Sequence, residues 1–154
     1  MQTKLLFSIG IVFGLSTLTN SKKVCEAGWV PYGDYCYYFS KAIRTFNDAV
    51  PSCYGVSAVL VEPNTIAEER WMLLQSVVRG IKNIWIGVTD LLENHTFVYI
   101  SNGNNVQEAY NNWDKGQPDP GNTEHCVALA DEYKGWHDYS CGQKFHFVCK
   151  KPKN

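Results

Sequence analysis

Four oxygen-bearing side chains gather in the second half of this 154-residue chain: Gln117, Asp119, Glu124 and Asp138. The segment 118–122, Pro-Asp-Pro-Gly-Asn, disfavours a regular helix or a central strand because it contains two prolines and a glycine. What it predicts is a polar loop that brings three carboxylates and one amide oxygen together. A hard cation such as calcium binds about six to eight oxygens of these kinds at about 2.3–2.6 Å. The alternative for the same residues is a solvated acidic loop.

Three short motifs give this stretch a resemblance to a known family. Residues Gln117–Asp119 read Gln-Pro-Asp, Glu124–Cys126 read Glu-His-Cys, and Trp136–Asp138 read Trp-His-Asp. This order resembles the long loop and last strands of a C-type lectin domain, and the resemblance extends from Cys25 to Cys149. In that family, Gln-Pro-Asp is the galactose-type motif and the Trp-x-Asp triplet supplies the remaining calcium ligands.

The resemblance implies a fold and a disulfide pattern. The fold is α+β and C-type lectin-like, with two helices flanking small antiparallel sheets, a long calcium-binding loop and three disulfides. Spacing alone leaves every pairing of the six cysteines open. The resemblance pairs them as Cys25–Cys36, Cys53–Cys149 and Cys126–Cys141, and the first pair would mark the long form of the domain.

The resemblance also implies a cofactor and a ligand. One Ca²⁺ ion would be held by Gln117, Asp119, Glu124 and Asp138, and the partner would be a glycan with galactose-type vicinal hydroxyls. His137 stands where the family usually has a calcium-binding asparagine. We include it in the predicted binding set because neutral imidazole can hydrogen-bond a sugar, although it suits a hard ion poorly. The alternative for His137 is a surface position without a ligand.

Two other features depart from the family pattern. Galactose-binding relatives commonly place a tryptophan after Gln-Pro-Asp to cover the sugar, whereas residues 120–122 read Pro-Gly-Asn here. Tyr110 and Tyr139 are the candidate substitutes. At the auxiliary calcium site Asp90 matches, but Asn94, Pro120 and His125 stand where acids are expected. We therefore predict one calcium rather than two.

The N-terminal segment has the order of a secretory signal. Lys4 precedes an apolar run over residues 5–15, and small or polar residues follow. We expect a signal peptide over 1–21, a domain over 22–154, and a secreted, extracellular protein. All six cysteines follow the signal, as in an extracellular disulfide framework. Asn94-His95-Thr96 is a possible N-glycosylation acceptor.

Hydrophobic patterning places the elements around the loop. The segment 25–39 predicts a hairpin that turns at Gly33-Asp34. A helix is expected over 41–54, kinked or stopped early by Pro51, and a second over 65–79 with an apolar face that includes Ile66, Trp71, Leu74 and Val78. Glu62-Pro63-Asn64 has the letters of the mannose-type motif but precedes this helix, so we interpret it with Thr65 as a helix start. Strands are expected over 58–61, 85–88, 97–100, 126–130, 135–141 and 145–150.

Other functions have weaker support. The net charge of −1 indicates neither nucleic acid nor an anionic membrane surface as a partner, and no further apolar run suggests membrane insertion. None of the four histidines lies in a nucleophile or metal motif, so an enzyme is not expected. The main alternative is a calcium-independent domain of the same fold that binds a protein or mineral surface. A homo-oligomer is possible because weak single sites gain from multivalency.

Overall fold

The computed structural model describes residues 23–92, 95–121, 123–130 and 135–154. The predicted signal segment and the Asn94 acceptor lie outside the described residues and stay predictions. In the described part of the chain the elements are β1 (Val30–Tyr32), β2 (Tyr35–Phe39), α1 (Phe46–Tyr54), β3 (Val59–Leu60), α2 (Ile66–Val78), β4 (Asn83–Thr89), β5 (Val98–Tyr99), β6 (Cys126–Ala130), β7 (Trp136–Tyr139) and β8 (His146–Pro152). No helix among these residues has the length and apolar character needed to cross a membrane.

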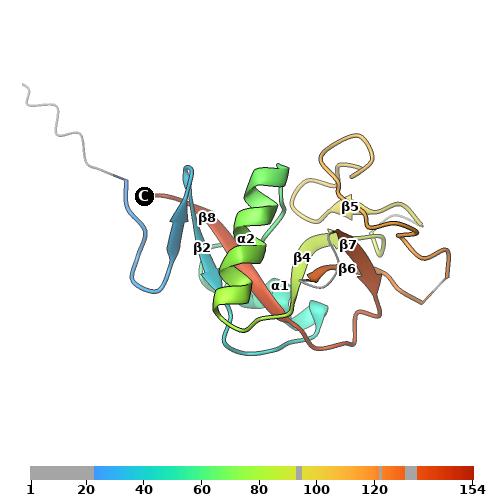
Figure 1. The fold of residues 1–154 in the computed structure, drawn as a ribbon, viewed down its shortest axis with the longest axis horizontal. Coiled ribbons are helices and arrows are strands. Elements are labelled where there is room, and N and C mark those ends of the chain that lie inside the picture. The colour runs from blue at the N-terminus through green and yellow to red at the C-terminus, as the bar shows by residue number, and fades with distance from the viewer. Residues whose placement is uncertain (1–22, 93–94, 122, 131–134) are drawn as a thin grey trace, which may run out of the picture.

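The strands join into one mixed sheet in the order β1-β2-β8-β4-β6-β7, with β3 beside β8 and β5 beside β4. Pairing between the named strands is antiparallel except where β4 runs parallel to β8, with Ile84 opposite His146 and Trp85 opposite Phe147. In Figure 1, α2 lies across β8, while β5, β6, β7 and the long loop lie together at one end. The α+β fold is confirmed. The parallel seam, which forms because the C-terminal strand inserts between the first hairpin and β4, replaces the purely antiparallel sheets that we expected.

Three disulfides tie the elements together in the pairing that the resemblance implies. Cys25 is bonded to Cys36, Cys53 to Cys149 and Cys126 to Cys141. The Cys53–Cys149 bond joins α1 to β8 across a sequence separation of 96 residues. Closing a loop of that length removes unfolded-chain entropy equivalent to about 4–5 kcal/mol in the chain-entropy description.

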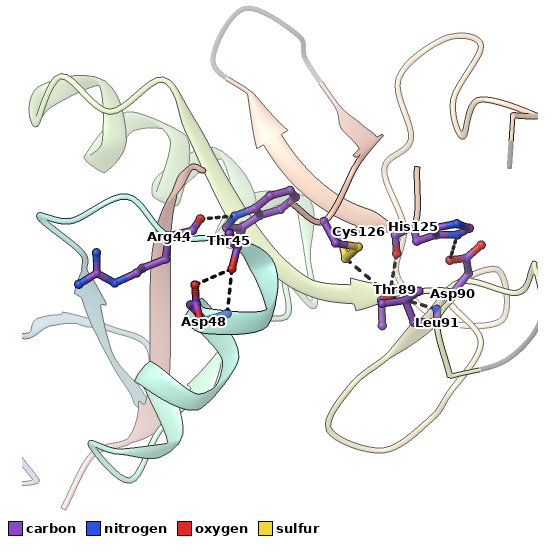
Figure 2. The surroundings of a disulfide bond; sticks show 10 residues. Arg44, Thr45, Asp48, Thr89, Asp90, Leu91, His125 and Cys126 are labelled. Atoms are coloured by element: carbon purple, nitrogen blue, oxygen red, sulfur yellow. Dashed lines mark hydrogen bonds and ion pairs between the residues drawn. A yellow bond between two sulfur atoms is a disulfide. The ribbon is translucent and has the colours of Figure 1, made fainter. Parts of the chain in front are cut away.

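Helix α1 begins later than the apolar pattern predicts. The backbone of Arg44 exchanges two hydrogen bonds with Phe145, at 2.8 and 3.0 Å, so residue 44 is already committed to a β-bridge. Thr45 then caps the helix by accepting from the Asp48 N–H, as Figure 2 shows. Of the two outcomes predicted at Pro51, a kink or an early stop, the early stop does not occur. Because proline removes only the one bond that its N–H would donate, the helix continues to Tyr54 and ends with the Gly55 N–H bonded to the Pro51 carbonyl.

The buried face of α2 is not the face that its aliphatic residues predict. Leu74 and Val78 are 60% and 74% exposed, whereas Glu68 and Glu69 are buried with Met72 and Ser76. Each buried glutamate has hydrogen-bond donors from other elements, which offset the cost of removing its carboxylate from water. The ends of α2 were therefore predicted correctly, but of its predicted apolar face only Trp71 packs against the core, whereas Ile66, Leu74 and Val78 are exposed.

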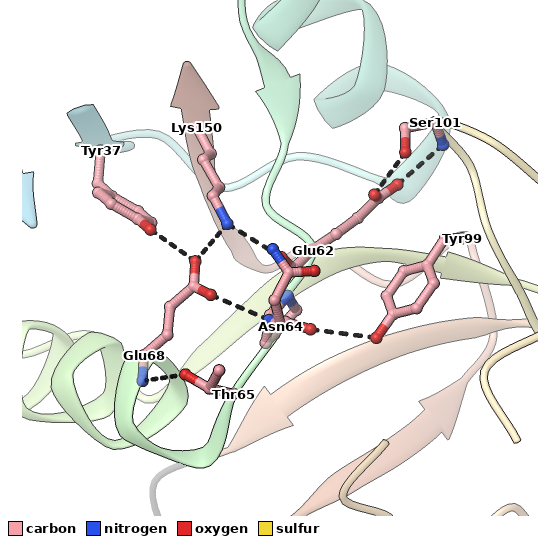
Figure 3. A network of polar contacts seen from close by, with 9 residues as sticks. Tyr37, Glu62, Asn64, Thr65, Glu68, Tyr99, Ser101 and Lys150 are labelled. Carbon is pink, nitrogen blue, oxygen red and sulfur yellow. Dashed lines mark hydrogen bonds and ion pairs between the residues drawn. The ribbon is translucent and has the colours of Figure 1, made fainter. Parts of the chain in front are cut away.

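Glu68 joins the start of α2 to the central sheet (Figure 3). Its carboxylate accepts from Tyr37 Oη at 2.6 Å, from Lys150 Nζ at 2.5 Å and from the Asn64 N–H at 2.9 Å. Its own N–H donates to the Thr65 hydroxyl at 3.1 Å, so the helix start predicted for this segment is confirmed. Burial and the neighbouring carboxylate raise the pKa of Tyr37, which keeps the phenol a donor.

Glu62 links the segment before α2 to the loop after β5. Its two carboxylate oxygens accept from the Ser101 N–H at 2.8 Å and the Ser101 hydroxyl at 2.6 Å, as Figure 3 shows. The Glu62 side chain also packs against Gly87 in β4. A Cβ at position 87 would lie 2.8 Å from Glu62 Cγ and 2.9 Å from the Leu60 carbonyl oxygen.

We expect Gly87→Ala to lower the free energy of unfolding by about 1–3 kcal/mol because the added methyl overpacks this contact. Urea unfolding followed by tryptophan fluorescence measures the change. Gly142→Ala is the matched control, since the nearest atom to its added Cβ is Ser140 Oγ at 3.9 Å. Equal stability of the two variants would contradict the expected clash.

Candidate metal centre

Three of the predicted ligands line one open cavity of about 300 Å³. Asp119 comes from the long loop, Glu124 from the residues just before β6, and Asp138 from β7. The cavity wall is completed by Asp90, His95, Phe97 and the backbone turn over 118–121. The structure therefore places carboxylates that lie up to 19 positions apart around one cavity.

Two side-chain oxygens, Gln117 Oε1 and Asp138 Oδ2, are buried and have no hydrogen-bond partner among the residues that the structure describes. The other oxygen of Asp138 accepts from the Asp119 N–H at 2.9 Å, which fixes the loop against β7. The peptide bond between Gln117 and Pro118 is cis. Buried polar atoms are normally paired, so an unpaired acceptor in the loop and another in β7 are the features that a bound cation would explain.

The electrostatics of the cavity agree with that reading. Burial, followed by the charges of Asp138 and Asp119, raises the pKa of Glu124. Burial also raises the pKa of Asp138, with Asp119 and Asp90 adding to it and two backbone N–H groups opposing it. These carboxylates repel one another in the absence of a cation, and a divalent ion between them would remove the repulsion.

The chemical types of the oxygens suit calcium, but the side chains do not enclose an ion. Across the described residues, no three side chains of His, Cys, Asp or Glu lie close enough together to enclose a metal ion. The oxygens that are present are carboxylates and an amide carbonyl, which a hard cation prefers, and the two unpaired atoms supply both types. An ion here would depend on the amide of Gln117 and on water as well as on the acids.

His137 is held away from the cavity wall. Its Nε2 lies 3.0 Å from Asp114 Oδ2, and its ring stacks on Tyr139 with centroids 6.2 Å apart. The hydrogen bond from His137 lowers the pKa of Asp114. His137 is not among the residues that line the cavity, so its part in sugar binding stays a prediction.

At the position of the family's auxiliary calcium site, a histidine is paired with an aspartate. Asp90 Oδ1 lies 2.9 Å from His125 Nδ1, and the His125 carbonyl accepts from the Thr89 hydroxyl at 2.6 Å (Figure 2). The one acid that matches the family's auxiliary site therefore has an imidazole partner.

The two tyrosines that could replace the stacking tryptophan both make contacts within the protein. Tyr110 donates a hydrogen bond to Glu69, and the Tyr139 ring packs on Trp85, Phe145 and His137.

Glu69 is the residue that sequence reasoning missed. It lies in α2, is 1% exposed, and accepts from Tyr110 Oη at 3.0 Å, Asn112 Nδ2 at 2.6 Å and Trp136 Nε1 at 2.8 Å. Burial raises the pKa of Glu69, while its three side-chain hydrogen bonds act in the opposite direction. A second glutamate beside Glu68 was the only signal, and the exposed aliphatic face of the helix hid it.

The segment that Glu69 holds is also tied to β7 by its backbone. The Trp136 N–H donates to the Asn112 carbonyl at 2.7 Å, and the Asp114 N–H donates to the Trp136 carbonyl at 3.1 Å. Trp113 packs between Phe97 and Trp136, with centroid distances of 4.9 and 5.7 Å. Residues 110–114 are therefore fixed before the loop reaches Gln117.

Comparison with known proteins gives consistent matches. The family described as Lectin C-type domain matches residues 42–151. The chain is 36% identical over 138 residues to lithostathine-1-beta from Homo sapiens, which covers 86% of this chain and 81% of that protein. It is 29% identical over 127 residues to CD209 antigen-like protein A from Mus musculus, covering 82% of this chain and 52%, about half, of that protein.

Solved structures give the same picture. The mouse scavenger receptor C-type lectin carbohydrate-recognition domain has a TM-score of 0.76 at 33% identity, with 84% of this chain and 98% of that chain covered. Human lithostathine has a TM-score of 0.74 at 35% identity, with 84% and 100% covered. These proteins are named as lectins, antigens or lithostathines rather than as enzymes.

We expect the free energy of unfolding of the native protein to increase relative to that of Glu69→Gln as pH falls from 7 towards 4.5. The raised pKa of Glu69 means that its contribution to stability is fully present below the unfolded-state pKa and is lost as pH rises through the folded-state pKa. Glutamine does not titrate, so the native protein gains relative to the variant on acidification. Urea unfolding in EDTA at several pH values measures this difference.

The exposed Glu108→Gln is the control, and its difference from the native protein should not vary with pH in this way. A Glu69→Gln difference that stays constant or shrinks on acidification would show that the three hydrogen bonds outweigh burial at Glu69.

Proposed function

This chain belongs to the family of C-type lectin domains, and from that premise we propose that it is a secreted lectin that binds galactose-type glycans through one calcium ion in the long loop. Domains of this family commonly bind Ca²⁺, and carbohydrate binding is the activity that the family suggests. The single observation that carries the proposal is the buried oxygen Asp138 Oδ2, which has no partner among the described residues, in the cavity that Asp119 and Glu124 also line; Gln117 Oε1, outside that lining, is likewise buried and unpaired.

The residues of the chain have distinct parts in this proposal. Gln117, Asp119, Glu124 and Asp138 would hold the ion. When bound, calcium supplies a double positive charge and open coordination positions that two neighbouring sugar hydroxyls can fill. Glu124 and Asp119 accept hydrogen bonds from those hydroxyls, and charge assistance makes such bonds stronger than neutral ones. Asp138 receives the Asp119 N–H and so sets the position of the loop.

The order of amide and carboxylate is the argument for galactose-type specificity. Gln117 offers an amide, with donors and an acceptor, while Asp119 offers acceptors alone. The mannose-type order in the family is the reverse. With no tryptophan after Asp119, affinity for a single sugar should be weak, about −4 kcal/mol or near millimolar, so an oligomer or a clustered glycan would strengthen binding by multivalency.

The extracellular setting is part of the proposal. We infer that residues 1–21 are removed as a signal peptide, that residues 22–154 form the secreted domain, and that Asn94 can carry a glycan. The three disulfides suit an oxidising compartment.

The second candidate function is calcium-independent binding of a protein or mineral surface by the same fold. The contact that favours it is His137 with Asp114, because it places a hydrogen-bonded histidine where a calcium-binding asparagine would otherwise stand. A calcium titration separates the two candidates.

We expect Asp138→Asn to weaken calcium binding by at least about tenfold, since it removes one of the charges that set the affinity of an oxygen site. Titration calorimetry and tryptophan fluorescence, both reversible with EDTA, measure the affinity. Asp34→Asn is the matched control, an exposed acid in the first hairpin. Native affinity in a folded Asp138→Asn protein, or no binding by the native protein at several millimolar calcium, would favour the second candidate.

We expect Gln117→Glu combined with Asp119→Asn to shift preference from galactose-type to mannose-type glycans by at least about tenfold, equivalent to about 1.4 kcal/mol. A glycan array read with calcium and again with EDTA measures the ratio of signals. The control is the native protein on the same array. An unchanged ratio in a variant that still binds calcium would remove the specificity argument and leave the calcium site intact.

A further inference from the structure

The described surface has two regions of opposite charge. The cavity at the long loop is lined by four acids, Asp90, Asp119, Glu124 and Asp138. Two other hollows, of about 460 and 640 Å³, are lined by basic residues and by no acid. In a chain whose net charge is only −1, this separation is a property of the fold rather than of the composition.

The two basic hollows adjoin. Both are lined by Tyr38, Ser40 and Lys41. Arg44 belongs to the smaller hollow, and Arg79 and His146 belong to the larger. We call the surface over both hollows, formed by Tyr38, Ser40, Lys41, Arg44, Arg79 and His146, the basic groove.

The groove lies away from the long loop. In Figure 1 the connection from β2 to α1, which carries Lys41 and Arg44, and the C-terminal end of α2, next to Arg79, lie low in the view, whereas the long loop lies at the upper right. The basic groove and the calcium cavity share no lining residue. A ligand in one therefore leaves the other accessible.

The cations of the groove are available to a ligand. Lys41, Arg44 and Arg79 are exposed, and in the described part of the chain none of them lies within ion-pair distance of a carboxylate. Arg44 and Arg79 each use Nη1 to donate to neutral acceptors, the Ile43 carbonyl and the carbonyl and side chain of Gln75. Their other N–H groups are left to face an anion, and a guanidinium can bind an oxyanion with two hydrogen bonds.

Several groups around these cations are fixed in place. The Arg79 guanidinium sits over the Phe39 ring, 4.6 Å from its centroid. His146 donates from Nδ1 to the Ser40 carbonyl at 2.9 Å, and Ser40 in turn accepts from the Phe147 N–H at 2.8 Å. The groove floor is therefore part of the β2–β8 pairing and needs little reordering when a ligand binds.

We propose that the basic groove binds a sulfated polysaccharide chain and that it does so without calcium. Two adjoining hollows suit a linear ligand, and at least three cations without an intervening acid suit a repeated, permanently ionised group such as a sulfate ester. Tyr38, which lines both hollows, supplies an apolar wall between the charges, which suits the apolar face of a sugar ring. A hollow with cations on its borders is less suited to the flat face of an anionic membrane.

The test uses the full protein, with heparin as the sulfated probe and two controls: chemically desulfated heparin, which keeps its carboxylates but has no sulfate, and dextran, which is uncharged. In EDTA, we expect heparin to bind with an affinity that falls as salt increases, and the two controls not to bind. Lys41→Gln combined with Arg44→Gln should weaken heparin binding by roughly tenfold, because each exposed charge contact contributes a factor of about three.

The matched control is Arg70→Gln combined with Lys115→Gln, which removes the same charge from exposed positions outside the groove and should change heparin affinity by less than about twofold. Asp138→Asn should also bind heparin as the native protein does, so loss of the calcium site and loss of the groove are distinguishable. Circular dichroism and thermal unfolding establish that each variant is folded.

Three results would overturn the proposal. The first is equal weakening by the groove variant and its control, which would mean diffuse charge attraction. The second is tighter, groove-dependent binding to phosphatidylserine vesicles than to heparin, which would assign the groove to a membrane. The third is head-to-tail self-association in light scattering that both the groove variant and Asp138→Asn abolish, which would make the occupant the acidic loop of a second copy.

Discussion

The carboxylate of Glu69 is the constraint on which the functional end of the molecule depends. Over its described residues, 100–121 and 123–125, the long loop contains no named helix or strand, so its position comes from side chains together with a few backbone hydrogen bonds. Glu69 collects three donors from Tyr110, Asn112 and Trp136. Removing the acceptor would leave buried donors unpaired, at about 1–3 kcal/mol each. An acid that is costly to bury is thus kept because neutral donors on two separate segments converge on it.

This arrangement explains how acidic side chains can be held near one another in the cavity. The aromatic packing of Trp113 between Phe97 and Trp136, with the backbone bonds between residues 112–114 and 136, fixes β7 and the loop relative to α2. Asp138 and Asp119 are then held close together, although burial and, after it, their charges raise the pKa of Glu124. The packing of Phe97, Trp113 and Trp136 holds this region together. The carboxylates of the cavity repel one another, and a cation would relieve that repulsion. The unpaired oxygens of Gln117 and Asp138 are compatible with a cation there.

The features of this structure that depend on local chemistry could be predicted from the sequence. The turn at Gly33-Asp34, the cap at Thr65 and the convergence of Asp119, Glu124 and Asp138 follow from residue types, and the disulfide pairing follows from the family resemblance. The interior face of α2 could not be found in this way. Apolar periodicity assumes that aliphatic residues face the core, whereas Glu68 and Glu69 are buried by donors that come from positions more than 30 residues away. The direction of the His137 ring likewise depends on Asp114, which local sequence does not reveal.

The parallel seam between β8 and β4 connects the two charged regions of the molecule. His146 and Phe147, at the groove, lie opposite Ile84 and Trp85 in β4, and β4 pairs in turn with β6, which starts two residues after Glu124. Trp85 contacts Tyr139 next to Asp138, so one aromatic residue separates the floor of the groove from the strand that carries a cavity carboxylate. This path is made of buried, close-packed side chains with a fixed register, so the groove and the cavity are held at a fixed spacing within the fold.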